Sequence, residues 1–246
     1  MPKSNYFHSL DERKTIQQLE KLQSVRKLRE SLPDWLDELC EKEIGKDFDK
    51  IIRALNQPPT IVLRANTLKT TPVKLQTILA EEGIKETSLI DWAPDALELK
   101  FTRNVFRTQA FHDGMFEVQD AASQMVATFM DVVPCMRVVD ACAGAGGKTL
   151  HIAALMKNKG KILALDTKSN KLAELKKRAA RADAKNIETK LIDSSKVIKR
   201  LKDTADRLLL DVPCSGLGVL RRNPDTKWKL TPEELEREKK IQQEIL

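Results

Sequence analysis

Four short apolar segments in the second half of the chain each end in an aspartate. They are MRVVD (136–140), KILALD (161–166), IETKLID (187–193) and RLLLD (207–211), and helical patterns lie between them. Strands that alternate with helices at this interval indicate βαβ units and a parallel sheet. Because open α/β sheets bind ligands at the carboxyl edge of their strands, the pattern predicts a ligand site lined by carboxylates.

The region before this sheet is predicted to begin with helices. Residues 10–55 have a helical pattern that Leu32-Pro33 interrupts, and Pro33 can open a second helix running to about Leu55. The run Asn56–Pro59 is typical of a linker. The sequence therefore predicts a helical N-terminal region over residues 1–57.

A small α+β module is expected next. Residues 60–66 alternate like a strand, and Thr71-Pro72 supplies an N-cap and a first-turn proline for a helix that stops near Gly83. We place this module at residues 58–125 and a doubly wound α/β domain with a mostly parallel sheet at residues 126–246.

Composition excludes several classes of protein. No apolar run approaches the ~18 residues of a membrane span, and the N-terminus lacks the apolar core of a secretory signal. Four cysteines, none in a Cys-x-x-Cys pair, argue against structural zinc and against a disulfide scaffold. The sequence predicts a cytoplasmic protein with no metal, whose thiols are buried or used in chemistry.

The positive charge is concentrated in one segment. The net charge of the chain is +7, and residues 168–202 contain twelve Lys or Arg but only four Asp or Glu. A basic flank suits a polyanion such as nucleic acid. A solvated helix face explains the same charge equally well.

The segment DACAGAGGKT (140–149) allows two interpretations. Against the pattern G-x-x-x-x-G-K-[ST] it matches a phosphate-binding loop, except that Cys142 replaces the first glycine. RLLLD would then be the strand that ends in a magnesium-binding aspartate. A nucleotide triphosphatase is therefore one candidate function.

The other interpretation is a loop for S-adenosylmethionine. Gly144, Gly146 and Gly147 let the backbone approach a ligand closely. Asp166 follows Gly147 by 19 residues, at the end of the next strand, where a carboxylate can accept hydrogen bonds from ribose hydroxyls. Asp193, one strand further, can receive the adenine amino group. This combination favours a methyl donor over a triphosphate.

A thiol follows the fourth strand, in the segment DVPCSGLG (211–218). Free cysteine is often only a small buried hydrophobe. Here the loop context suggests that Cys214 faces a cleft, where Arg221 and Arg222 would favour its thiolate. Methylation of a pyrimidine at carbon 5 needs a thiolate at carbon 6, and Asp211 is placed to hold the ring nitrogens.

Several motifs together resemble the Sun/RsmB family of RNA 5-methylcytosine methyltransferases. The motifs are SLPDWL (31–36), VLRANTLK (62–69), GMFEVQDAASQ (114–124), DACAGAGGKT, DVPCSGLGVLRRNPDTKW and IQQEIL. The resemblance covers about residue 31 to the end. It implies a Rossmann-like methyltransferase domain behind a small RNA-binding module, with S-adenosylmethionine as cofactor and ribosomal or other structured RNA as substrate.

The resemblance also implies roles for individual residues. Asp166 would hold the ribose, Asp193 the adenine, and Asp211 would lie between cofactor and target base. Cys214 matches the auxiliary cysteine that assists product release. The methionine part of the cofactor would be held by the loop residues Cys142, Ala143, Gly144, Ala145, Gly146, Gly147 and Lys148. Contacts to RNA are expected from Arg64, Asn66, Arg221 and Arg222.

Two departures from the family pattern stand out. The common Ala-Pro of the loop is Gly144-Ala145 here, and the Thr-Cys-Ser motif that carries the family's nucleophile is absent from the sequence. Thr231–Glu234 is a capping box whose helix runs into Leu246 without a C-cap. We expect a chain truncated at its C-terminus, with an incomplete sheet and no nucleophile. The alternatives are that Cys214 itself attacks the base, or that the chain is a catalytically silent RNA-binding protein.

Overall fold

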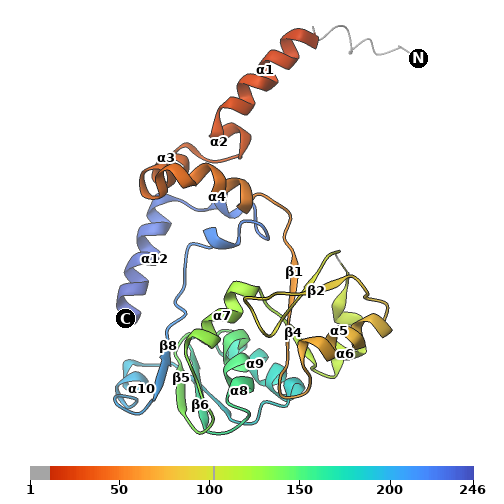
Figure 1. Cartoon of the computed structure of the whole chain (residues 1–246). Helices are drawn as coiled ribbons and strands as arrows, with labels where there is room; N and C mark the ends of the chain where they lie inside the picture. Colours follow the sequence, from red (N-terminus) through yellow and green to blue (C-terminus); the bar gives the residue numbers. More distant parts are fainter. Residues whose placement is uncertain (1–11, 102) are drawn as a thin grey trace, which may run out of the picture. The chain divides into compact units, whose positions relative to one another are not determined.

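The computed structural model describes residues 12–101 and 103–246, which divide into two compact units (Figure 1). One unit combines the described residues up to Pro59 with Cys214–Ile245, and the other spans Thr60–Pro213. The second unit holds both sheets of the described chain. No helix within the described ranges is long and apolar enough to cross a membrane.

The parallel sheet has the strand order β7-β6-β5-β8, with all three strand pairs parallel. This confirms the predicted doubly wound α/β architecture. The strands are β5 (Arg137–Asp140), β6 (Lys161–Asp166), β7 (Ile187–Leu191) and β8 (Arg207–Leu209). The neighbouring helices are α7 (Ala121–Phe129), α8 (Gly147–Leu155), α9 (Ser169–Ala182) and α10 (Ser195–Lys199).

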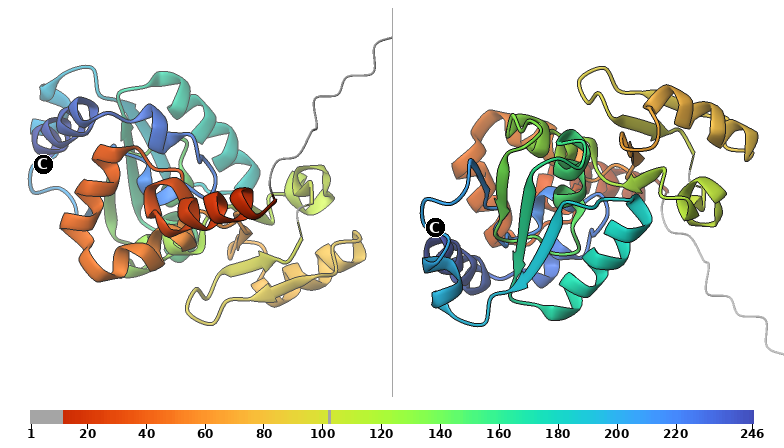
Figure 2. Two further views of the ribbon diagram at one scale, coloured as in Figure 1. Left: turned by 90° about the horizontal axis from the view of Figure 1, so that it is seen from above. Right: turned by 90° about the horizontal axis from the view of Figure 1, so that it is seen from below.

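Burial on both faces explains why residues 162–165 of β6 are all apolar. Ile162 packs in a cluster with Ile152 of α8, while Leu163 and Leu165 pack on the opposite face with Val197 of α10. Successive side chains of a strand point to opposite faces, so a sheet covered on both sides needs a continuous apolar run. Figure 2 shows the strands and their flanking helices from two further sides, in green to light blue.

The small module is an antiparallel sheet of order β2-β3-β1-β4 with helices packed against it. Leu63, Leu75, Leu97 and Phe116 form the centre of its core. The Thr71 hydroxyl accepts a hydrogen bond from the Lys74 backbone N–H at 3.3 Å, so the predicted N-cap is present. The elements are β1 (Ile61–Ala65), β2 (Thr87–Leu89), β3 (Ala96–Leu99), β4 (Phe116–Val118), α5 (Pro72–Glu81), the 3-10 helix Val105–Arg107 and α6 (Gln109–His112).

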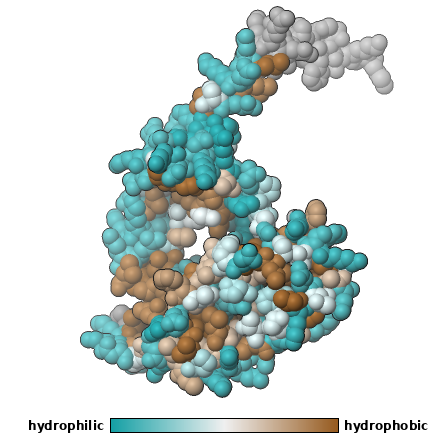
Figure 3. All heavy atoms as spheres, viewed as in Figure 1, coloured by the Kyte–Doolittle hydropathy of each residue, from teal (hydrophilic) through white to brown (hydrophobic). Residues whose placement is uncertain are grey.

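The other unit is helical. Its elements are α1 (Glu12–Ser24), α2 (Arg26–Arg29), α3 (Asp34–Ile44), the 3-10 helix Gly45–Asp47, α4 (Phe48–Leu55), the 3-10 helix Leu217–Val219, α11 (Thr226–Lys229) and α12 (Pro232–Ile245). The expected continuous helix from Pro33 to Leu55 is wrong, because Gly45 has φ 68° and ends α3. The visible surface over α3 is mostly hydrophilic (Figure 3).

The segment after Pro213 packs on these helices. Leu220 lies in one core with Leu36 and Phe48, and the Lys227 ammonium donates to the Glu30 carbonyl at 2.7 Å and to Asn56 Oδ1 at 3.0 Å. The compact units therefore divide the chain differently from the boundaries expected from the sequence.

Candidate cofactor site at the carboxyl edge of the parallel sheet

The strand order brings the predicted acidic residues to one edge. The strands lie side by side in the order β7, β6, β5 and β8. Asp193 follows β7, Asp166 ends β6, Asp140 ends β5 and Asp211 follows β8. All four strands run in the same direction, so these residues share the carboxyl edge.

The glycine loop connects β5 to α8 at this edge. Gly144 and Gly146 both have positive φ, 54° and 86°, a backbone region that residues with a side chain rarely adopt. A Cβ at Gly146 would lie 2.5 Å from Cγ of Leu175 on α9, whereas a Cβ at Gly144 would meet nothing within 4 Å. The loop therefore packs on α9 at Gly146, and Gly144 has open space beside it that a ligand can approach.

Asp166 fixes the loop. Its Oδ2 accepts a hydrogen bond from the Gly144 backbone N–H at 2.8 Å, and its Oδ1 accepts one from the Lys168 backbone N–H, also at 2.8 Å. A carboxylate has about four lone-pair positions, so each oxygen retains capacity for a ligand hydroxyl. Asp193, by contrast, is exposed, and its carboxylate accepts from the Ser194 hydroxyl at 3.0 Å.

Asp140 is a site residue that the sequence analysis did not single out. Its side chain is 1% exposed, and Oδ2 accepts from the Thr149 hydroxyl at 2.7 Å. Burial raises the pKa of Asp140 to about 6, although the Thr149 hydrogen bond opposes the shift. Within the described structure Oδ1 is buried without a hydrogen-bond partner. The signal was available, since Asp140 ends a strand as Asp166 does.

Lys148 and Asp211 form an ion pair across the same edge, with Nζ and Oδ2 at 2.5 Å. Lys148 is thus engaged by a carboxylate of the sheet edge. The thiol of Cys142 lies among the acidic residues, and burial raises its pKa, with Asp140, Asp166 and Asp211 adding to the rise. This thiol is therefore disfavoured as a thiolate.

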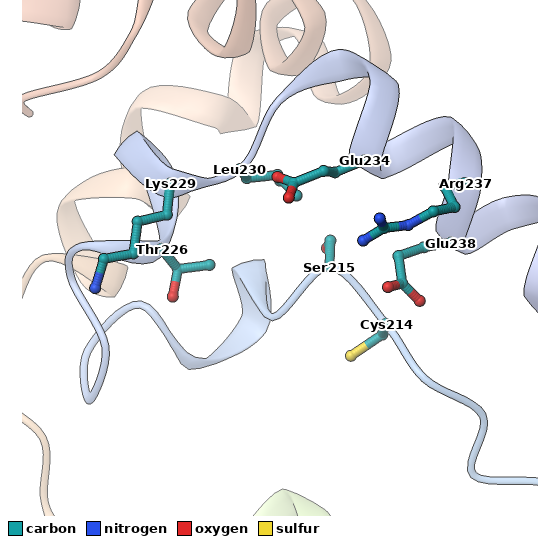
Figure 4. Close-up of a pocket in the computed structure, with 8 residues that line it drawn as sticks. All are labelled: Cys214, Ser215, Thr226, Lys229, Leu230, Glu234, Arg237 and Glu238. Carbon is teal, nitrogen blue, oxygen red and sulfur yellow. The ribbon is translucent and has the colours of Figure 1, made fainter.

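Cys214 belongs to the helical unit, whereas Asp211 belongs to the unit with the sheets. The exposed Cys214 lines a pocket of about 230 Å³ with Ser215, Thr226, Lys229, Leu230, Glu234, Arg237 and Glu238. Figure 4 shows Arg237 and Glu238 extending from α12 toward the Cys214-Ser215 segment. The catalytic pairing of Cys214 with Asp211 stays a prediction.

Arg221 and Arg222 are exposed in the helical unit. The Arg221 guanidinium donates to the Pro58 carbonyl at 2.7 Å, which ties its loop to the end of the N-terminal helices. Their expected contacts with RNA stay predictions.

Arg64 and Asn66 are buried, which argues against the RNA contacts expected of them. Arg64 is 3% exposed and donates from Nη1 to the Gln119 side chain and to the Gly147 carbonyl. Asn66 is 5% exposed and donates from Nδ2 to the carbonyls of Gly114 and Ala182, each at 2.8 Å. Both residues join the small module to the parallel-sheet domain.

The basic segment 168–202 is partly engaged within the protein. Arg178 and Arg181 of α9 form ion pairs with buried Glu117 of β4, with N···O distances of 2.8 and 2.5 Å. On the same helix Lys171, Lys176 and Lys177 are exposed. These lysines, rather than the two arginines, are available to a polyanion.

Relatives and solved structures resemble the chain over most of its length. A "Probable ribosomal RNA small subunit methyltransferase B" of Synechocystis sp. is 38% identical over 221 residues, which cover 88% of this chain and 49% of the relative. Its counterpart in Bacillus subtilis is 37% identical, with 88% and 48% covered. The chain spans about half the length of the curated relatives it matches.

The fold is shared with crystal structures. That of PH0851 matches with a TM-score of 0.83 and 31% identity, over 89% of this chain and 50% of that one. A methyltransferase homolog from Pyrococcus horikoshii matches with a TM-score of 0.73 and 28% identity, over 86% and 67%.

Two family models match in the order that the motifs predict. One, described as a ferredoxin-like domain of RsmF/B-like methyltransferases, covers residues 32–106. The other, described as 16S rRNA methyltransferase RsmB/F, covers residues 127–246. These matches favour the methyl-donor interpretation of the glycine loop over the triphosphatase one. On the combined sequence and structural agreement, the chain belongs to the RsmB/F family of rRNA methyltransferases.

Proposed function

We propose that this chain binds S-adenosylmethionine at the carboxyl edge of its parallel sheet and acts in the methylation of carbon 5 of cytosine in small-subunit ribosomal RNA. The observation that carries the proposal is the link between Asp166 and the glycine loop, in which Oδ2 accepts from the Gly144 N–H at 2.8 Å. It puts a strand-end carboxylate beside a glycine-rich loop, an arrangement that suits a ligand with a ribose diol.

The charge of the edge supports a cationic ligand. Four aspartates line it, and Lys148 is paired with one of them. Like charges repel strongly where solvent is partly excluded, so this edge disfavours a triphosphate. The sulfonium and ammonium groups of S-adenosylmethionine suit it.

The loop residues also fit the rest of the cofactor. Backbone N–H groups at the start of α8 have no intrahelical partners and can bind its carboxylate. Asp166 would take the ribose hydroxyls and Asp193 the adenine amino group. When bound, the cofactor supplies an electrophilic methyl group.

The chemistry at the base requires a sulfur nucleophile and proton transfers. A thiolate adds to carbon 6 of cytosine, which makes carbon 5 nucleophilic enough to take the methyl group. The proton of carbon 5 is then lost, the sulfur leaves carbon 6 and the ring double bond returns. We assign Asp211 to the ring nitrogens and Cys214 to product release. Because Cys214 matches the auxiliary cysteine, we do not assign the attack on carbon 6 to it.

Calorimetry with S-adenosylmethionine and, separately, with ATP and magnesium tests the cofactor. We expect heat of binding with the first ligand alone. Binding of ATP–magnesium without binding of S-adenosylmethionine would overturn the proposal in favour of a triphosphatase.

Transfer of tritium from labelled S-adenosylmethionine to unmodified small-subunit rRNA tests the reaction. Incorporation at carbon 5 of cytosine supports methyl transfer. Binding of cofactor and RNA without incorporation would instead favour the catalytically silent RNA-binding protein.

RNA that contains 5-fluorocytosine tests the role of Cys214, because fluorine at carbon 5 prevents release of an attached sulfur. We expect Cys214→Ser to leave the yield of any adduct unchanged. A covalent adduct that disappears in this variant would make Cys214 the nucleophile.

A further inference from the structure

We propose that the small antiparallel module holds the glycine loop in its ligand-binding conformation, with Arg64 and Arg178 as positioning residues and Glu117 as the anchor of Arg178. The inference rests on the proposed role of the loop as the cofactor site. It gives the module a part in cofactor binding in addition to any part in binding RNA.

Arg178 links the module to the loop directly. Its Nη1 donates to the Ala145 carbonyl at 2.8 Å, while Nη2 and Nε donate to Oε2 of Glu117 at 2.8 and 3.2 Å. Glu117 lies on β4 and its side chain is 5% exposed. Hydrogen bonds between charged groups in such a poorly hydrated place are strong and directional, so the position of Glu117 determines where the guanidinium of Arg178 lies.

Arg64 makes a second link two residues further along the loop. It lies on β1 directly across from Glu117 of β4, and its Nη1 donates to the Gly147 carbonyl at 2.5 Å. Burial lowers the pKa of Arg64 to about 10, and the nearby Glu117 opposes the shift, so the guanidinium stays charged at neutral pH. Arg64 of β1 and Arg178 of α9 thus bind alternate carbonyls of one loop.

The loop needs such support because of its composition. Three of its residues 144–147 are glycines, and glycine has the largest backbone freedom to lose on ordering. A carbonyl held on one side of a planar trans peptide turns the following N–H to the other side. Fixing the Gly147 carbonyl therefore orients the Lys148 N–H, one of the donors available to a ligand. A loop ordered in advance binds more tightly because less entropy is lost on binding.

Arg181 offers a matched control for Arg178. Both arginines come from α9, both form ion pairs with Glu117, and their side chains are similarly exposed, at 22% and 19%. Arg181, however, stacks over the Phe111 ring at 3.9 Å, and in the described chain none of its hydrogen bonds reaches the loop. Arg178 thus holds the Ala145 carbonyl, whereas Arg181 contacts Phe111 in place of the loop.

The test compares Arg178→Met with Arg181→Met in the full chain. Amide hydrogen exchange over residues 142–148 measures order in the loop without any ligand, and calorimetry measures the Kd for S-adenosylhomocysteine. In Arg178→Met we expect the rate of loop exchange and the Kd each to rise about tenfold. This size of effect corresponds to the loss of one charged hydrogen bond. In Arg181→Met both should change less than about twofold, although both variants lower the melting temperature.

Equal effects of the two variants on loop exchange, or none in Arg178→Met, would overturn the inference. Failure of the unmodified chain to bind S-adenosylhomocysteine would count against the proposed function, and exchange would then decide the inference alone. If the methionine variant does not fold, Arg178→Lys replaces it in the test, because lysine keeps a positive charge beside Glu117. One ammonium cannot span Glu117 and Ala145 as the guanidinium does, so the same rise in loop exchange is expected.

Discussion

The carboxylate of Asp166 accepts a hydrogen bond from the Gly144 backbone N–H at 2.8 Å. The residue expected to bind a ribose therefore also holds the loop that would surround the rest of the ligand. Its other oxygen accepts from the Lys168 N–H and orders the turn into α9. Binding and local order are coupled at this one side chain.

Replacement of Asp166 by alanine should weaken cofactor binding by about tenfold or more and lower the melting temperature by several degrees, because two backbone donors lose a charged acceptor. Asp166→Asn keeps one acceptor oxygen and should fall between alanine and wild type. Calorimetry and thermal unfolding measure the two effects. Glu174→Gln, an exposed change on α9, is the control. Unchanged affinity in the alanine variant would contradict the assignment.

Asp140 predicts a pH-dependent stability. Burial raises its pKa from 3.8 to about 6, so between these pH values the folded protein binds more protons than the unfolded chain. The contribution of Asp140 to the free energy of unfolding is therefore largest below pH 4 and falls as pH rises to about 6, by on the order of 3 kcal/mol.

Asp140→Asn removes this titration and should gain stability relative to wild type as pH rises through that window. Urea unfolding of both proteins between pH 4 and pH 7 measures the difference, with the exposed Asp203→Asn as control. A difference between wild type and Asp140→Asn that stays constant with pH would show that Asp140 is not the group responsible.

The two loop glycines should differ in their tolerance of alanine. Gly146→Ala adds a Cβ 2.5 Å from Leu175 Cγ at φ 86°, and should lower the free energy of unfolding by about 2–3 kcal/mol. A Cβ at Gly144 meets no neighbour within 4 Å, so Gly144→Ala should lower the free energy of unfolding by only about 1 kcal/mol, the cost of its positive φ. The added methyl group takes up the open space beside the loop and should weaken cofactor binding. Urea unfolding and calorimetry separate the effects. The reverse order of stabilities would contradict the described packing.

The exposed lysines of α9 predict a salt-dependent affinity for RNA. Changing Lys171, Lys176 and Lys177 together to glutamine should flatten the slope of log K against log salt by about 2, if each contacts a phosphate. Filter binding to a single-stranded rRNA fragment at several salt concentrations gives the slope. Lys161→Gln, whose ammonium pairs with Glu188 at 2.5 Å, is the control. An unaltered slope in the triple variant would remove this surface from the RNA site.

The parallel sheet could be predicted because its signals are local. The segment KILALD forms β6 over Lys161–Asp166 as expected, since burial on both faces requires the apolar run at residues 162–165. The row of aspartates followed from the same pattern, because parallel strands share a carboxyl edge. The capping box at Thr231 is local too, and the structure contains both of its hydrogen bonds with Glu234.

The surroundings of polar residues could not be predicted in the same way. An arginine on a strand has the same local pattern whether it faces water or another domain, so Arg64 was expected at an RNA surface and instead binds the Gly147 carbonyl, 83 residues away. Likewise nothing local to Leu220 indicates that it packs with Leu36. Local periodicity determines which segments become strands and helices, whereas the partners of a buried charge come from distant parts of the chain and exist only once the chain has folded.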